Sequence, residues 1–162
     1  MMRMMRLLMA ALAVTLAGAV AFAALPATPI VYVMRHLDTP EGERDPDLTP
    51  GGTARARALV QWFYGKSLTA IYVSDYKRTR QTAGPLAADR GITMKVYDPR
   101  DTPALVAMLK AEPGPVLVVG HSNTVPDIVE QLGGTRPAPL AHPDFGDVWT
   151  VGRGQTARDR LP

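Results

Sequence analysis

The sequence has no cysteine, only 6% aromatic residues and three histidines among its 162 residues. The lack of cysteine excludes a disulfide framework, a thiolate metal site and an anchor on a lipid-modified cysteine. A strong positive charge is also missing: the formal net charge is +3, and it falls to +1 once the two arginines of residues 1–23 are set aside. No basic stripe of the kind that nucleic-acid binding requires is present. The fold must therefore depend on its hydrophobic core, and we expect no nucleic-acid partner.

The first 23 residues have the pattern of a secretory signal peptide. Arg3 and Arg6 form a short basic region, residues 7–20 are apolar, and Ala21-Phe22-Ala23 fits a small-x-small cleavage site. The alternative is an uncleaved inner-membrane anchor, because residues 7–25 are nearly long enough to span a bilayer. We expect cleavage after Ala23. The mature chain, residues 24–162, is then one periplasmic or secreted domain, and it contacts a membrane only if the segment is retained.

Short apolar runs alternate with helical patterns along the rest of the chain. Strands are predicted at 30–34, 68–73, 92–97, 116–119 and, as a final edge strand, 147–152. Helices are predicted at 51–64, 78–90, 102–112, where Thr102 is the expected cap, and 124–132. Residues 153–162 are expected to be frayed. This alternation predicts an α/β fold, a three-layer sandwich with a mostly parallel sheet and helices on both faces.

Two of the three histidines each follow an apolar run. His36 ends the segment Ile30-Val-Tyr-Val-Met-Arg-His, and His121 follows Val116-Leu-Val-Val-Gly. Short β-branched runs of this kind are typical of buried parallel strands. Ligands of open α/β sheets bind beyond the carboxyl ends of the strands. The two histidines are therefore expected to face one another across a single pocket.

The residues near these strand ends suit a phosphate. Arg35 and Arg78 offer forked donors to a tetrahedral dianion, and His121 directly precedes a predicted helix N-terminus, which also favours anions. A neutral histidine can attack phosphorus, and a protonated one can stabilise the transferring group. His142 lies in a predicted loop and is expected to be structural. No second histidine falls at ligand spacing around His36 or His121, so no metal or other cofactor is expected.

Four blocks of residues, in order along the chain, resemble the histidine phosphatase superfamily, the group related to phosphoglycerate mutase. These blocks are Val33–His36 with Thr39, Leu48–Pro50 with Gly52, residues 74–83, and residues 118–122. The resemblance spans nearly all of residues 24–162. It implies a phosphoglycerate-mutase-like fold and a phosphoric monoester hydrolase that works through a phosphohistidine.

The resemblance also implies a role for each of the matched residues. It makes His36 the nucleophile that becomes phosphorylated, Arg35 and Arg78 the phosphate clamps, and His121 the second histidine of the pocket. On these grounds the leading interpretation is an exported phosphatase. Its expected partner is a phosphorylated small molecule or envelope component.

The proton donor for the leaving group is not identified by the sequence. An alkyl phosphate normally needs such an acid, but His121 is followed by Ser122, where acid phosphatases and phytases of this superfamily carry aspartate. Asp98 and Asp101, after the third predicted strand, are the two candidates, and the sequence does not choose between them. Asn123 and Thr124 are expected to add phosphate donors at the helix start.

The missing acid leaves two alternatives to an ester phosphatase. One is a non-catalytic module of the same fold that binds a phosphorylated ligand. The other is a phosphohistidine protein phosphatase, because small family members without an obvious donor favour substrates with good leaving groups. A cytoplasmic signalling substrate would, however, conflict with the predicted signal peptide.

Overall fold

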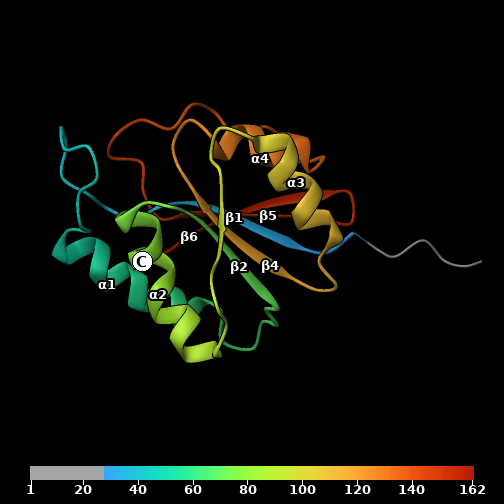
Figure 1. Cartoon of the computed structure of the whole chain (residues 1–162), viewed down its shortest axis with the longest axis horizontal. Coiled ribbons are helices and arrows are strands. Elements are labelled where there is room, and N and C mark those ends of the chain that lie inside the picture. Colours follow the sequence, from blue (N-terminus) through green and yellow to red (C-terminus); the bar gives the residue numbers. More distant parts are fainter. Residues whose placement is uncertain (1–27) are drawn as a thin grey trace, which may run out of the picture.

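The computed structural model describes residues 28–162, and the predicted signal peptide, residues 1–23, lies outside this range. Six strands and four helices follow one another along the described chain (Figure 1). They are β1 (Val31–Arg35), α1 (Pro50–Trp62), β2 (Ala70–Ser74), α2 (Lys77–Arg90), β3 (Lys95–Tyr97), α3 (Thr102–Ala111), β4 (Val116–Gly120), α4 (Val125–Gln131), β5 (Asp147–Gly152) and β6 (Gln155–Arg160).

The strands form one mixed sheet in the order β3-β2-β4-β1-β5-β6. The first four strands in this order are parallel, whereas β5 and β6 are antiparallel to their neighbours. In the pairing of β1 with β4, Arg35 lies opposite Gly120, and the next N–H, of His36, donates to the Gly120 carbonyl over 2.9 Å. The two strands therefore end side by side, and the residue after each end is a histidine.

Helices cover both faces of the sheet, so the predicted three-layer α/β fold is confirmed. Helices α1 and α2 lie on one side of the strands and α3 and α4 on the other (Figure 1). Side chains of β1 alternate between the two cores: Met34 packs with residues of α1 and α2, and Val33 with residues of α3 and α4. This period of two is what a strand buried on both faces requires.

The carboxyl-terminal residues correct two of the sequence predictions. Residues 153–162 were expected to be frayed and β5 to be an edge strand, but β6 pairs with β5 along its whole length and forms the edge itself. Beyond β6, Leu161 is 2% exposed, and its N–H donates to the Gly146 carbonyl over 2.8 Å. The polar sequence of β6 gave no apolar signal because its residues are mostly exposed.

The ends of several elements also differ from prediction. Helix α3 is capped by Asp101, whose carboxylate accepts from the Ala104 N–H over 3.0 Å, so Thr102 is its first residue and not its cap. Strand β3 is only three residues long and does not begin at Ile92.

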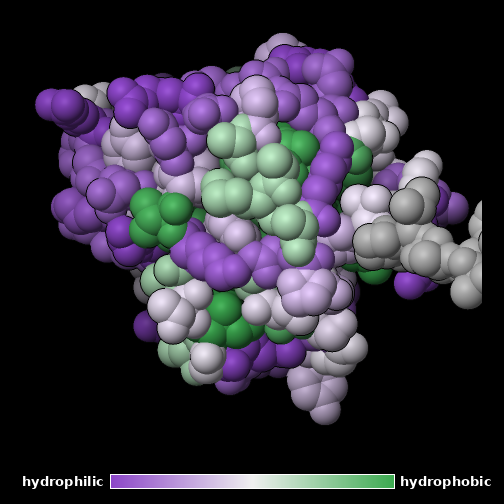
Figure 2. Space-filling model, turned by 45° about the vertical axis from the view of Figure 1, so that its right-hand side comes forward, coloured by the Kyte–Doolittle hydropathy of each residue, from purple (hydrophilic) through white to green (hydrophobic). Residues whose placement is uncertain are grey.

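No helix within residues 28–162 has the length and apolar character needed to cross a membrane. The face in Figure 2 is mainly hydrophilic, with apolar residues gathered in separate patches.

The start of α1 fixes the loop that follows β1. Thr49 caps the helix by accepting from the Gly52 N–H over 3.0 Å, and its own N–H donates to the Asp38 carbonyl over 2.8 Å. A Cβ on Gly52 would lie 2.5 Å from that same carbonyl oxygen. Only glycine therefore lets the helix approach the backbone two residues beyond His36.

We expect Gly52→Ala to lower the free energy of unfolding by roughly 1–3 kcal/mol, because the new methyl group meets backbone that cannot rotate away. Gly51→Ala is the matched control, since its Cβ would lie 3.7 Å from the nearest atom. It should be neutral or add about 0.5–1 kcal/mol, as Ala does in a helix. Urea unfolding of both variants checks this. Equal effects at the two positions would contradict the proposed close approach.

Candidate active site

Two buried imidazoles lie together beyond the ends of β1 and β4. His36 is 5% exposed and His121 is 8% exposed, and their ring centroids are 5.5 Å apart. The preceding Gly120 leaves room for the turn: a Cβ there would lie 2.9 Å from the Thr124 hydroxyl oxygen, which accepts from the His121 N–H. The predicted juxtaposition of the two strand-end histidines is thus present in the structure.

A hydrogen bond fixes which nitrogen of the neutral His36 ring carries the proton. Its Nδ1 lies 2.9 Å from the Leu37 carbonyl oxygen, which can only accept, so Nδ1 carries the hydrogen and Nε2 holds a free lone pair. Burial lowers the pKa of His36, the hydrogen bond to the Leu37 carbonyl raises it, and the charges of Arg35 and Arg78 and the interaction with His121 lower it, which together bring it to about 3. His36 is therefore neutral at pH 7, which is the form that can act as a nucleophile.

The His121 ring is oriented by a chain of hydroxyl groups. Its Nε2 lies 2.8 Å from the Ser74 Oγ, which donates in turn to the Thr79 Oγ1 over 3.2 Å. On the other side of the ring, an Arg78 N–H points at Nδ1 over 3.4 Å, so Nδ1 accepts and Nε2–H donates to Ser74. Burial lowers the pKa of His121 to about 4, with Arg78 and Arg35 acting in the same direction and Asp45 opposing them.

Arg78 reaches the site from the first turn of α2. Its guanidinium pairs with the Asp45 carboxylate over 3.2 Å, also donates to the Arg44 carbonyl, and lies over the Tyr76 ring at 4.3 Å. Asp45 in addition accepts from the Lys77 N–H at the start of the helix. The loop after β1 therefore holds Arg78 in place beside His121.

Arg35 lies next to His36 but is turned toward the loop of residues 136–146. Its Nη1 donates to the carbonyls of Ala141 and Asp144 over 2.8 and 3.1 Å, and its guanidinium lies 4.1 Å from the centre of the Phe145 ring. Arg35 is 8% exposed, and its Nε has no hydrogen-bond partner. A buried donor without a partner is costly.

A cavity of about 310 Å³ lies between the histidines and the end of β3. We call it the histidine cavity; it is lined by His36, Tyr76, Arg78, Pro99, Arg100, His121, Ser122, Asn123 and Thr124. Of the four principal residues predicted from the sequence, three line this cavity: His36, Arg78 and His121. Arg35 does not line it. The cavity's positive and neutral donors suit an anion of the size of phosphate.

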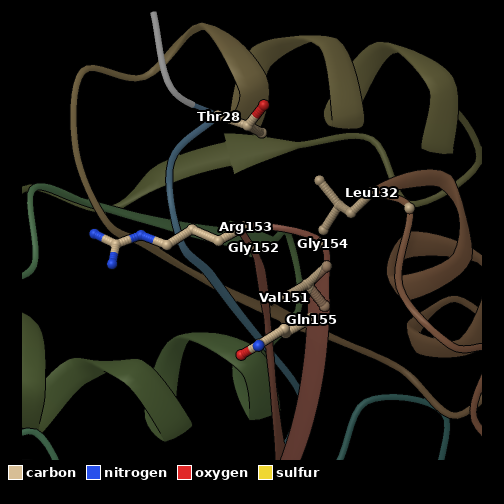
Figure 3. A pocket seen from close by; sticks show the side chains of 8 residues that line it. Thr28, Leu132, Val151, Gly152, Arg153, Gly154 and Gln155 are labelled. Carbon is tan, nitrogen blue, oxygen red and sulfur yellow. The ribbon is translucent and has the colours of Figure 1, made fainter.

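Another cavity, of about 380 Å³, lies beyond the opposite ends of the strands, next to Thr28 and the turn between β5 and β6 (Figure 3). Its one charged lining residue, Arg153, extends away from the other labelled side chains in Figure 3. Neither pocket histidine lines it. The histidine cavity is therefore the better candidate for the active site.

The two further donors differ in availability. Asn123 is exposed and lines the histidine cavity, whereas the Thr124 hydroxyl is buried and binds the backbone of His121. Helix α4 begins at Val125 and has seven residues. Asn123 is accordingly the better placed of the two to meet a ligand.

Neither predicted acid lines the histidine cavity. The Asp98 carboxylate accepts from the Arg100 guanidinium over 2.8 and 3.0 Å, and these bonds lower its pKa to about 2. Asp101 is engaged as the cap of α3. His142, the third histidine, bonds through Nε2 to the Thr39 carbonyl and packs against Phe145. Within residues 28–162, no group of three or more acidic or histidine side chains is arranged to hold a metal ion.

The comparisons with known proteins agree with this arrangement. Residues 31–100 match the model of the histidine phosphatase superfamily, branch 1. The chain is thus similar to the histidine phosphatase superfamily over 70 of its 162 residues. The matched segment contains the Arg35-His36 pair and Arg78 of the superfamily pattern, and the fold brings His121, which lies outside that segment, to the same place.

Several solved structures share the fold of this chain. The protein histidine phosphatase SixA complexed with tungstate is 22% identical, covers 80% of this chain and 94% of its own, and gives a TM-score of 0.61. Mycobacterial glucosyl-3-phosphoglycerate phosphatase Rv2419c is 15% identical, with coverages of 82% and 98% and a TM-score of 0.64. Bacillus stearothermophilus YhfR is 18% identical, with coverages of 82% and 96% and a TM-score of 0.61. A search of the curated proteins found no match.

Three residues that contact the predicted set were not singled out from the sequence. Ser74 binds His121, Asp45 binds Arg78, and Phe145 packs against both Arg35 and His36. Ser74 could have been found from its position at the carboxyl end of β2. Asp45 and Phe145 lie in loops, where no periodicity indicates which side chains turn inward.

We expect the free energy of unfolding to fall as the pH decreases from 7 to 4. Both histidines have a pKa lowered in the folded protein, so the unfolded chain takes up their protons first, below about 6.5. The stability they contribute is complete above that pH and is lost toward their folded pKa values, with a slope on the order of 1.4 kcal/mol per pH unit for each.

Urea unfolding of the wild type and of His36→Asn and His121→Asn at pH 4, 5, 6 and 7 measures this slope. Each variant removes one titrating group, so its slope should be shallower than that of the wild type. Inorganic phosphate should also flatten the wild-type slope, because a bound phosphate anion favours protonated His121. Identical slopes in all three proteins would contradict the neutral state of the histidines.

Proposed function

We propose that this chain is a phosphatase that hydrolyses phosphate monoesters through a phosphohistidine on His36. The observation that carries the proposal is the free Nε2 of a neutral His36, held by Leu37 and facing a cavity lined by Arg78 and His121. In the first step Nε2 forms a bond to phosphorus while the bond to the ester oxygen breaks. In the second step water attacks the phosphohistidine and releases inorganic phosphate.

Each residue near the cavity has a distinct part in this proposal. Arg78 donates to the phosphoryl oxygens, and the unpartnered Nε of Arg35 offers a further donor beside the nucleophile. His121 is neutral in the free protein, but a dianion beside it raises its pKa. His121 then gains a proton on Nδ1 and becomes a donor to the charge that develops in the transition state.

A phosphohistidine protein phosphatase is the second candidate. The similar fold of SixA, a protein histidine phosphatase, favours it, and so does the lack of an acidic residue in the lining of the histidine cavity. A nitrogen leaving group demands less of an acid than an alkoxide does. A non-catalytic phosphate-binding module is the remaining alternative, and the experiment below separates it from both enzymes.

Export is a further part of the proposal and depends on residues 1–23. Their basic start, apolar run and small-x-small end support a signal peptide that delivers the domain to the periplasm or beyond. The substrate would then be a phosphorylated small molecule or envelope component. Fusion of residues 1–30 to a reporter that is active only after export tests this directly, and an Arg3→Glu, Arg6→Glu pair serves as the export-deficient control.

We expect rapid mixing with a labelled phosphomonoester to give a burst of acid-labile, alkali-stable phosphate on the wild-type protein. His36→Ala should give no burst, whereas His142→Ala, which changes a histidine outside the cavity lining, should retain it.

Arg78→Ala should lower kcat by about 10³-fold or more, because it removes charge stabilisation from the transferring phosphoryl group. Tight phosphate binding without a burst from any ester or phosphohistidine would identify the binding module instead.

A further inference from the structure

A second cavity lies next to the histidine cavity, on the side of β3. This adjoining cavity has a volume of about 560 Å³ and shares Tyr76, Pro99 and Arg100 with the histidine cavity. Its remaining lining residues are Asp75, Val96, Tyr97 and Asp98. A phosphate held by the histidines would therefore have its ester group directed past Tyr76 and Pro99, or away into solvent.

The adjoining cavity has apolar lining residues on one side, and its acidic residues form ion pairs with arginines. Val96 is 49% exposed, one of few large apolar side chains in the described chain to be so open. Tyr76 and Pro99 continue the same wall toward the phosphate. At the rim, Asp98 pairs with Arg100 over 2.8 Å, and Asp75 pairs with Arg80 over 2.7 Å.

The Tyr76 ring is fixed by the catalytic groups. Arg78 lies over it at 4.3 Å, and its centroid is 5.1 Å from that of His121, in an edge-to-face arrangement. A ring held by two neighbours loses little further freedom when a ligand packs against it.

An independent observation concerns the proton for the leaving group. The lining of the histidine cavity includes no Asp or Glu among residues 28–162. Asp98, a carboxylate of the adjoining cavity, is held ionised by Arg100. An alcohol would have to leave as an alkoxide, close in basicity to hydroxide, whereas an aromatic hydroxyl ionises near pH 10 and can leave without a proton.

We propose that the adjoining cavity binds the aromatic ring of the leaving group, so that the substrates are phosphate esters of aromatic hydroxyls. This inference rests on the proposed phosphatase function and assigns Val96, Tyr76 and Pro99 to the leaving-group site. The bond from phosphorus to the phenolic oxygen breaks as Nε2 of His36 forms its bond to phosphorus. The phenolate carries away the electron pair and takes its proton from water after release.

The first experiment varies the leaving group. A series of substituted phenyl phosphates, O-phosphotyrosine, a phosphotyrosine peptide, glycerol phosphate and phosphohistidine are compared by kcat/KM. We expect a steep rise with leaving-group acidity among the phenyl phosphates and at least 10²-fold lower values for glycerol phosphate. Preference for the peptide or for the small esters tells whether the ring is presented by a protein or by a free molecule.

The second experiment changes the ring site alone. Val96→Glu should raise KM for phenyl phosphates by about 3- to 10-fold, because it replaces an apolar contact by a charge. The inhibition constant of inorganic phosphate, which occupies only the histidine cavity, should stay within about twofold. Met108→Glu is the matched control, since Met108 is 41% exposed on α3 and lines neither cavity. It should change neither constant.

Three outcomes would overturn the inference while leaving the proposed function intact. Glycerol phosphate could form the phosphohistidine as fast as phenyl phosphates do. Phosphohistidine could exceed every aryl ester in kcat/KM. Val96→Glu could leave KM unchanged or weaken phosphate inhibition equally. If no substrate gives a phosphohistidine burst, the proposed function itself fails, and the two failures are thereby distinguished.

Discussion

The parallel pairing of β1 with β4 is the constraint on which the site depends. Because Arg35 lies opposite Gly120, the residues that follow are brought to the same edge of the sheet and to the same height. The hydrogen bond from the His36 N–H to the Gly120 carbonyl extends this register by one residue beyond β1. A slip of one residue would turn every side chain of a strand to the other face. It would separate the imidazoles and expose both cores at once.

Burial beside cations keeps the site in a poised electrostatic state. Two arginines and two histidines share a small volume, and the protein meets this repulsion by keeping both imidazoles neutral. His36 thereby retains the lone pair on its Nε2. A phosphate dianion reverses the balance, because it supplies the negative charge that the empty cavity lacks. Protonation of His121, which the neighbouring arginines disfavour in the free protein, is therefore favoured only by the negative charge of a bound phosphate.

The sequence was sufficient to predict the parallel core and the meeting of the two histidines. Buried strands such as β1 and β4 have continuous apolar runs, and the chemistry follows from what stands at their ends. Strand β6 could not be predicted in this way, since it is mostly exposed and is held by backbone pairing with β5. The residues that contact Arg78 and Arg35 could not be predicted from the sequence either. Asp45 and Phe145 belong to loops whose paths are set by tertiary contacts. The local sequence pattern therefore does not indicate what these two residues contact.

The contacts of Arg35 link the reacting centre to a distant loop. The guanidinium binds the carbonyls of Ala141 and Asp144 through one nitrogen, while another nitrogen of the same rigid plane has no partner. A ligand that moved the guanidinium away from the loop would weaken its bonds to the Ala141 and Asp144 carbonyls. A ligand that bound the guanidinium in its present position would strengthen them. Binding of an anion at Arg35 would therefore be coupled to its contacts with Ala141 and Asp144.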